Sequence, residues 1–80
     1  MGQNPLRNCN ANEIRKFAQS HGFHKSSMNG DDEIWVNNQL SAIFRIPSRN
    51  EVIPIGTMNA MVMKSKISKK VWKDWLESNT

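Results

Sequence analysis

The chain has 80 residues, of which 38% are hydrophobic and 22% are charged, and its formal net charge is +4. This length permits one domain with a single small core, and the hydrophobic share excludes an intrinsically disordered chain. The excess of basic residues favours an anionic partner, nucleic acid before a membrane surface, although a basic surface that serves solubility alone explains the charge equally well.

Cys9 is the only cysteine of the chain, which excludes an internal disulfide framework and fits a reducing environment. No apolar run approaches the length of a transmembrane helix, and residues 1–10 lack the apolar stretch of a signal peptide. We therefore expect a cytoplasmic protein, with residues 1–9 as a flexible lead-in and residues 10–78 as one domain.

The first predicted helix spans about Ala11–His21. Asn10 is placed to cap its start, and Glu13 follows three residues later in the pattern of a capping box. Gly22 tolerates the left-handed conformation that ends many helices. One face of this helix is apolar at helical spacing and consists of Ile14, Phe17, Ala18 and His21.

A hairpin is expected next, with strands over residues 23–28 and 33–37 and turn residues at 29–32. We expect Met28 to lie opposite Glu33, which fixes the register of the two strands. On that register Ser26 lies opposite Trp35, and His24 lies opposite Asn37.

The same register assigns the two faces of the sheet. It places Phe23, Ile34 and Val36 on the core face and turns Trp35 outward together with Glu33. An outward Trp on an open sheet is a good anchor for a protein partner or a platform for stacking a base, unless the N-terminal segment covers it. We therefore expect Trp35 to contact a partner.

The third predicted strand spans Leu40–Ile46 and follows a three-residue turn at 37–39. The odd length of this turn places the apolar residues of the strand on the same face as Ile34. Pro47 ends the strand because it has no backbone N–H to donate to a neighbouring strand. The alternating apolar residues are Leu40, Ala42, Phe44 and Ile46.

Two helices follow an extended segment at residues 52–55. Thr57 is placed to cap a helix from Met58 to about Lys66, and Ser68 is placed to cap a last helix, Lys69–Glu77. Their apolar faces consist of Met58, Met61 and Val62 in the first and of Val71, Trp72, Trp75 and Leu76 in the second. The whole order predicts an α+β two-layer domain, α-β-β-β-α(-α), with helices on one face of a three-stranded antiparallel sheet.

The order of these elements and several short sequence strings resemble the HicA family of bacterial toxins. This family adopts a double-stranded-RNA-binding-domain-like (dsRBD-like) fold and includes RNA-cleaving toxins that pair with HicB antitoxins. The resemblance covers about Asn10 to Glu77 and rests on the order and spacing of five strings. These strings are His21-Gly22-Phe23, Gly30–Trp35, Ile46-Pro47, Ile53–Met58 and Ile67-Ser68.

The resemblance implies where the catalytic site lies. The family's turn typically reads Gly-Ser-His or Gly-Asp-His before the strand, and its His is the expected catalytic residue. Here Gly30 and Asp31 match that pattern, while Asp32 stands at the position of the His. An imidazole both accepts and donates a proton near neutrality, whereas an ionised carboxylate only accepts one and repels phosphate. Direct catalysis with Asp32 as a weak base is therefore the less favoured interpretation. The favoured ones are a natural inactive variant and a His replaced so that a toxic protein could be produced.

Neither His of the chain is placed to substitute at this position. His24 lies four residues from the turn, about 13 Å along a strand, and His21 is expected to be a structural residue on the apolar side of its helix. The acidic residues Asp31, Asp32 and Glu33 attract hard cations in principle, but three adjacent residues around a turn rarely converge on one ion. An exposed acidic turn is the favoured interpretation, and we expect no metal site.

The basic residues are the candidate RNA contacts. A dsRBD-like fold binds A-form RNA through its shape, its phosphates and its 2′-OH groups, for which lysine and arginine suffice. Lysines on a helix most often form a solvated face. The two interpretations have about equal weight for this chain, and the family resemblance favours RNA. The candidates are Lys25, Arg45 and Arg49 on or near the sheet, and Lys64, Lys66, Lys69, Lys70 and Lys73 in the C-terminal third.

The leading hypothesis is thus the toxin of a type II toxin–antitoxin system, in a family of metal-independent endoribonucleases that cleave mRNA, with activity weakened or lost through Asp32. The resemblance implies mRNA and a HicB-like antitoxin as partners, without a membrane or a small-molecule cofactor. The alternative is a catalytically inactive RNA-binding or protein-interaction module of the same fold.

Overall fold

The computed structural model describes residues 9–78 and shows a mixed α+β fold. In this part of the chain a three-stranded antiparallel sheet has the order β2-β3-β4, and a second, short pair joins β1 to β5. The predicted α+β class with a three-stranded antiparallel sheet is confirmed. In chain order the elements are β1 (Cys9–Asn10), α1 (Ala11–Ser20), β2 (His24–Asn29), β3 (Asp32–Asn37), β4 (Ala42–Pro47), β5 (Val52–Ile53), α2 (Ile55–Ser65) and α3 (Lys69–Ser78).

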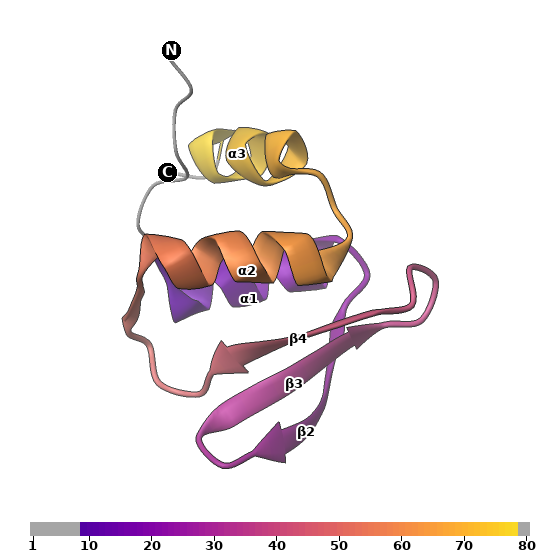
Figure 1. Cartoon of the computed structure of the whole chain (residues 1–80), viewed down its shortest axis with the longest axis vertical. Coiled ribbons are helices and arrows are strands. Elements are labelled where there is room, and N and C mark those ends of the chain that lie inside the picture. The colour runs from indigo at the N-terminus through magenta and orange to yellow at the C-terminus, as the bar shows by residue number, and fades with distance from the viewer. Residues whose placement is uncertain (1–8, 79–80) are drawn as a thin grey trace.

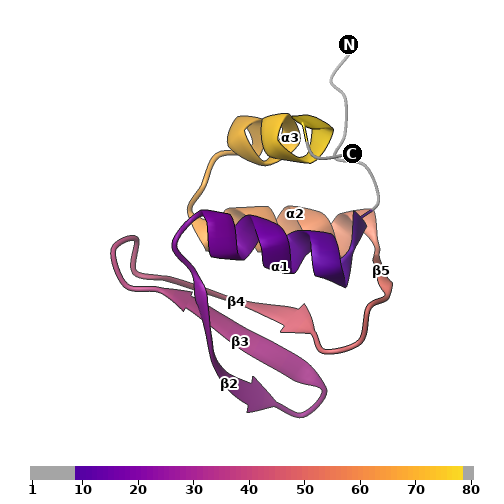
Figure 2. The same ribbon diagram turned by 180° about the vertical axis from the view of Figure 1, so that it is seen from behind.

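Helices α1 and α2 lie over one face of the three-stranded sheet, and α3 lies on the far side of these two helices (Figures 1 and 2). Trp72 of α3 connects the layers, because its ring stacks on Phe17 of α1 with a centroid distance of 3.6 Å and meets Phe44 of β4 edge-on at 6.2 Å. Phe44 also meets Phe23 edge-on at 5.1 Å. One aromatic cluster therefore joins sheet and helices.

Helix α1 begins and ends at the capping residues that the sequence predicts. The Asn10 side chain accepts a hydrogen bond from the Glu13 N–H, and the Glu13 carboxylate accepts one from the Asn10 N–H, both at 3.1 Å. The helix ends at Ser20, and Gly22 follows with a φ of +88°. The predicted capping box and the predicted glycine ending are both confirmed.

Strand β4 has the predicted alternation, since Ala42, Phe44 and Ile46 are buried while Ile43 and Arg45 are exposed. The predicted hairpin register is correct only near the turn, where Met28 lies opposite Glu33. An irregularity between Lys25 and Ser27 then shifts β2, so that Lys25 lies opposite Trp35 and His24 opposite Val36. One extra residue on β2, a β-bulge, accounts for the difference from the simple alternation.

The predicted faces of β3 are wrong. Trp35 is only 4% exposed and lies opposite Phe44 on the helix-covered face, while Ile34 and Val36 lie on the open face. The cause is the loop from β3 to β4, which has four residues (38–41) and not three, because Asn37 lies opposite Ala42. One additional loop residue exchanges the two faces of a strand.

Buried Asn37 organises this four-residue loop. Its side-chain oxygen accepts a hydrogen bond from the Leu40 N–H at 3.0 Å, and its side-chain nitrogen donates one to the His21 carbonyl at 2.9 Å. Ser41 completes the loop with a φ of +53°. Leu40, expected inside the strand and in the core, consequently lies in the loop and is 38% exposed.

The helix ends differ from prediction at one place. Helix α2 begins at Ile55 with Pro54 as its N-cap, so Thr57 lies inside the first turn and makes no cap. Proline at this position gives the extended conformation that precedes a helix without donating a backbone hydrogen bond. Helix α3 agrees with prediction, and the Ser68 hydroxyl accepts a hydrogen bond from the Val71 N–H at 3.3 Å. Val71, expected on its apolar face, is 39% exposed.

The N-terminal expectation is partly corrected. Cys9, assigned to a flexible lead-in, lies opposite Ile53 in the β1–β5 pair and is 1% exposed. Two residues so far apart in the chain leave no local sequence signal of their pairing. The rest of the predicted lead-in, residues 1–8, lies outside the described residues.

Candidate nucleic-acid interface

The turn between β2 and β3 places the candidate catalytic residues. Asn29 lies opposite Asp32, so Gly30 and Asp31 form a two-residue loop. Gly30 has a φ of +64°, as the first loop residue of a type II′ hairpin turn requires. The carbonyl of Asp31 accepts a hydrogen bond from the Ser48 N–H at 2.9 Å. This bond fixes the turn beside the end of β4.

Asp32 lies on the open face of the sheet, directly opposite Pro47, and is half-buried. Its side chain borders a cavity of about 230 Å³, which also has Arg45 from β4 and Lys64 from α2 in its lining. Thr57, near the start of α2, borders the same cavity. The structure thus brings one acidic candidate and two basic candidates together around one space.

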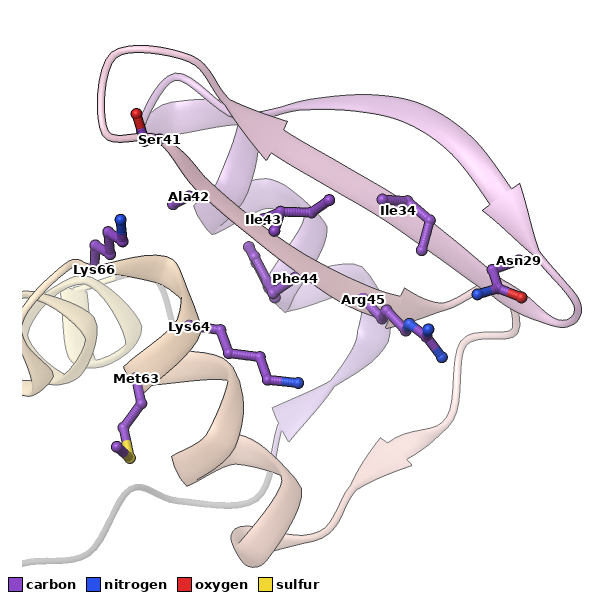
Figure 3. Close-up of a pocket in the computed structure, with 10 residues that line it drawn as sticks. All are labelled: Asn29, Ile34, Ser41, Ala42, Ile43, Phe44, Arg45, Met63, Lys64 and Lys66. Atoms are coloured by element: carbon purple, nitrogen blue, oxygen red, sulfur yellow. The ribbon is translucent and has the colours of Figure 1, made fainter.

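A second cavity, of about 610 Å³, continues along β4 and shares Phe44, Arg45 and Lys64 with the first. Figure 3 shows that its lining residues come mainly from β4 and the C-terminal end of α2, together with Ile34 of β3 and Asn29 of β2. The Lys64 side chain extends toward Arg45, and Met63 points away. We call the two cavities together the β4–α2 groove. Its charged lining residues are Asp32, Arg45, Lys64 and Lys66.

In the described part of the chain, the basic residues of the groove have no acidic partner. Within residues 9–78, no carboxylate forms an ion pair with Arg45, Lys64 or Lys66. Lys69 extends this set, because it borders a further cavity of about 630 Å³ between α2 and α3 together with Lys66. The four residues form a path of positive charge from β4 past the end of α2 to the start of α3. Such a path attracts phosphate groups.

The other predicted RNA contacts lie outside the groove. Lys25 approaches Glu33 at 3.9 Å, and Lys70 pairs with Asp74 at 2.9 Å. The hydrogen bond and the negative charge of Asp74 raise the pKa of Lys70 above its ordinary value. Arg49 is exposed after β4, and Lys73 is half-buried on α3.

The sequence did not predict a cluster of hydrogen bonds around the Glu33 carboxylate. One oxygen of its carboxylate accepts hydrogen bonds from Arg15 Nε at 2.9 Å and from the Trp35 indole N–H at 3.0 Å. The Arg15 guanidinium also donates to the carbonyl of Pro47. The Glu33 side chain is 12% exposed. Arg15 and Glu33 lie on different elements, and no local pattern links them.

These contacts define the charge of Glu33. Burial raises the pKa of its carboxyl, but the hydrogen bonds from Arg15 and Trp35 and the positive charges of Arg15 and Lys25 outweigh burial, so the pKa lies below its ordinary value. Trp35 is therefore a buried structural residue that holds an ionised carboxylate. The expectation that Trp35 is an outward-facing anchor for a partner is wrong.

Neither histidine borders the groove. His21 Nδ1 lies 2.9 Å from the Phe17 carbonyl, and its ring stacks on Phe17 at 4.1 Å, which confirms the predicted structural role. His24 is exposed opposite Val36, at the far end of the hairpin from Asp32. The groove thus offers one carboxylate that can accept a proton and cations that can hold phosphate, but no imidazole.

Comparisons with protein-family models, with curated proteins and with solved structures found no match to this chain. Among residues 9–78, no helix is long and apolar enough to cross a membrane. In the same residues, no three His, Cys, Asp or Glu side chains gather in a way that could hold a metal ion.

Proposed function

We propose that this chain is a cytoplasmic RNA-binding domain of the HicA-like toxin type, with weak or absent RNA cleavage and a HicB-like antitoxin as its partner. The observation that supports this proposal is the β4–α2 groove, where Arg45 and Lys64 flank Asp32 and form no ion pair with any carboxylate of residues 9–78. An RNA phosphate in the groove pairs with these two cations, against the repulsion of the Asp32 carboxylate. The sequence resemblance supplies the toxin family, and the groove supplies the binding chemistry.

Cleavage of RNA by the 2′-OH requires two proton transfers. A base takes the proton of the 2′-OH, and an acid gives a proton to the leaving 5′ oxygen. The Asp32 carboxylate is suited to the first transfer only, and its charge opposes the phosphate that Arg45 and Lys64 attract. A well-placed acid–base group contributes about 10²–10⁴-fold to a rate, so its absence brings cleavage close to the background rate.

The second candidate is a catalytically inactive RNA-binding module on the same fold. It is favoured by the fact that neither His21 nor His24 lies in the groove. Both proposals include RNA binding. They differ in whether a histidine at position 32 restores RNA cleavage.

The test compares wild-type protein with Asp32→His and Asp32→Asn on one RNA across about pH 5 to 8. We expect Asp32→His to cleave the RNA and to arrest growth on expression. Asp32→Asn removes the charge without supplying an imidazole, so it should bind RNA more tightly and still not cleave it. Equal cleavage by wild type and Asp32→His would refute the assignment of position 32. Inactivity of both, with RNA bound, would favour the second candidate.

Binding is tested separately through its salt dependence. Each lost phosphate contact reduces the slope of log affinity against log salt by about 0.7 to 0.9. We expect Arg45→Ala and Lys64→Ala each to reduce this slope, and Lys70→Ala, which removes a lysine already paired with Asp74, to leave it almost unchanged. Equal effects of all three variants would show that RNA contacts the surface without using the groove.

A further inference from the structure

Strand β4 lies at an edge of the three-stranded sheet. The β3–β4 register shows which of its residues bond to β3 and which point their backbone groups outward. In an antiparallel pair, bonded and non-bonded residue pairs alternate. Ser48 and Asp31 are the residues that follow the Pro47–Asp32 pair in the β3–β4 register. The Ser48 N–H donates a hydrogen bond to the Asp31 carbonyl, so Asp31–Ser48 is a bonded pair. The bonded pairs inside the ladder are therefore Glu33–Ile46, Trp35–Phe44 and Asn37–Ala42.

It follows that the backbone N–H and C=O groups of Ile43 and Arg45 point away from β3. No strand lies on that side of β4, and within residues 9–78 no hydrogen bond occupies these four groups. Free edge groups of this kind form a template for another strand. Pro47 is the next residue of β4 whose backbone groups point away from β3. It has no N–H, and its carbonyl already accepts a hydrogen bond from Arg15.

The β4–α2 groove runs directly along this edge. Five consecutive residues, 41–45, border its larger cavity, and helix α2 forms the opposite wall in the reverse chain direction. Ser41 and Lys66 lie at one end, and Pro47 and Thr57 lie at the other. The six residues of β4 span about 20 Å at 3.3 Å per residue, which is the length of an ordinary strand.

The lining indicates which kind of strand fits. Ile43, which is 55% exposed, offers an apolar contact on the open face. Arg45, Lys64 and Lys66 supply positive charge along the larger cavity, and no carboxylate of residues 9–78 forms an ion pair with them. Asp32 is the acidic residue in the lining, and it borders the smaller cavity at the other end. An extended segment that alternates apolar and acidic residues matches both features.

We propose that the β4–α2 groove accepts an extended acidic segment of a partner protein, which pairs with β4 as a fourth strand and sets its carboxylates against Arg45, Lys64 and Lys66. A peptide strand supplies both donors and acceptors at the spacing of β4. Phosphate groups supply acceptors alone, which leaves the carbonyls of Ile43 and Arg45 to water or to the 2′-OH groups of an RNA. The edge therefore favours a peptide, although the cations by themselves serve either ligand.

Two strained residues support a binding role at one end of the groove. Ser41 and Lys66 are the non-glycine residues with positive φ in residues 9–78, at +53° and +63°, and both border the larger cavity. Glycine or asparagine is the usual choice at the end of a helix such as α2, where Lys66 stands. Backbone strain of this kind concentrates at binding sites. Here it places a lysine where the charge faces the groove.

The test uses a defined probe, an eight-residue peptide of alternating glutamate and valine with acetylated and amidated ends. We expect saturable binding with a Kd below about 1 mM. The decisive readout is amide hydrogen exchange, in which the N–H groups of Ile43 and Arg45 should become protected by the peptide. The double variant Lys64→Glu/Lys66→Glu should bind at least about tenfold more weakly. Lys16→Glu, an exposed change on α1, is the control and should bind as wild type does.

A second peptide separates strand pairing from simple charge attraction. It has the same sequence with an N-methyl group on every residue, which removes the N–H donors of both strand edges but keeps every charge. Equal binding of both peptides, or unchanged exchange at Ile43 and Arg45, would overturn the proposal. Absence of saturable binding at about 1 mM would do the same. RNA binding is measured on the same samples, so a failed peptide with intact RNA binding overturns strand pairing alone.

Discussion

Removal of the Glu33 carboxylate is expected to destabilise the fold. Glu33→Ala deletes the acceptor of the Arg15 and Trp35 hydrogen bonds, which measure 2.9 and 3.0 Å. A hydrogen bond to a charged group contributes about 1.5–3 kcal/mol, and an unpaired buried donor costs about 1–3 kcal/mol. Arg15 keeps some contact with water, since its side chain is 17% exposed. We therefore expect a loss of about 3 kcal/mol in the free energy of unfolding.

The pH dependence of this loss has a definite sign. Because the folded-state pKa of Glu33 lies below that of the unfolded chain, its contribution is complete above the unfolded-state pKa of about 4.3. The contribution is lost as the pH falls through the folded-state pKa. The difference in stability between wild type and Glu33→Ala should accordingly be largest near pH 7 and shrink toward pH 3.

Urea unfolding of both proteins at several pH values measures this difference. Asp31→Ala is the matched control, because Asp31 is an acidic residue of the neighbouring turn with an exposed side chain. Its backbone carbonyl, which the substitution keeps, accepts the hydrogen bond from Ser48. Its effect should stay within about 0.5 kcal/mol. If Glu33→Ala costs no more than this control at pH 7, or costs the same at pH 3 as at pH 7, the ionised Glu33 cluster does not stabilise the fold.

Two further predictions concern stability alone. Phe44→Ala should lower the free energy of unfolding by about 3–5 kcal/mol, because Phe44 is 2% exposed and lies between Phe23 and Trp72; a change below about 0.5 kcal/mol in urea unfolding would place Phe44 outside the core. Lys66→Gly should raise stability by about 0.5–1 kcal/mol by relieving the φ of +63°. Lys64→Gly, inside α2, should instead lower it by about 1 kcal/mol, and similar losses in both variants would contradict the left-handed conformation of Lys66.

The sequence predicts those parts of the fold that depend on neighbouring residues. The capping box of Asn10 and Glu13, the glycine at 22 and the alternation of β4 are all local, and the structure contains them. The pairing of Cys9 with Ile53 and the contact of Arg15 with Glu33 join distant segments, and no period or cap encodes them.

The same distinction holds for the candidate site. Asp32, Arg45 and Lys64 are each predictable as candidates, but their meeting around one cavity depends on α2 running alongside β4 in the opposite direction. The eight basic candidates look equivalent in the sequence. Only the structure separates those that border the groove from Lys25 and Lys70, which have acidic partners.

A single loop residue decides the roles of two adjacent carboxylates. With a three-residue loop after β3, Asp32 would share the helix-covered face with Ile34, and Glu33 would face solvent. The four-residue loop exchanges them: Glu33 is buried against Arg15, and Asp32 lies on the open face beside the cations of the groove. Glu33 therefore stabilises the fold, whereas a substitution at Asp32 leaves the core unchanged. This separation is why Asp32→His is expected to alter RNA cleavage while the free energy of unfolding stays close to that of the wild type.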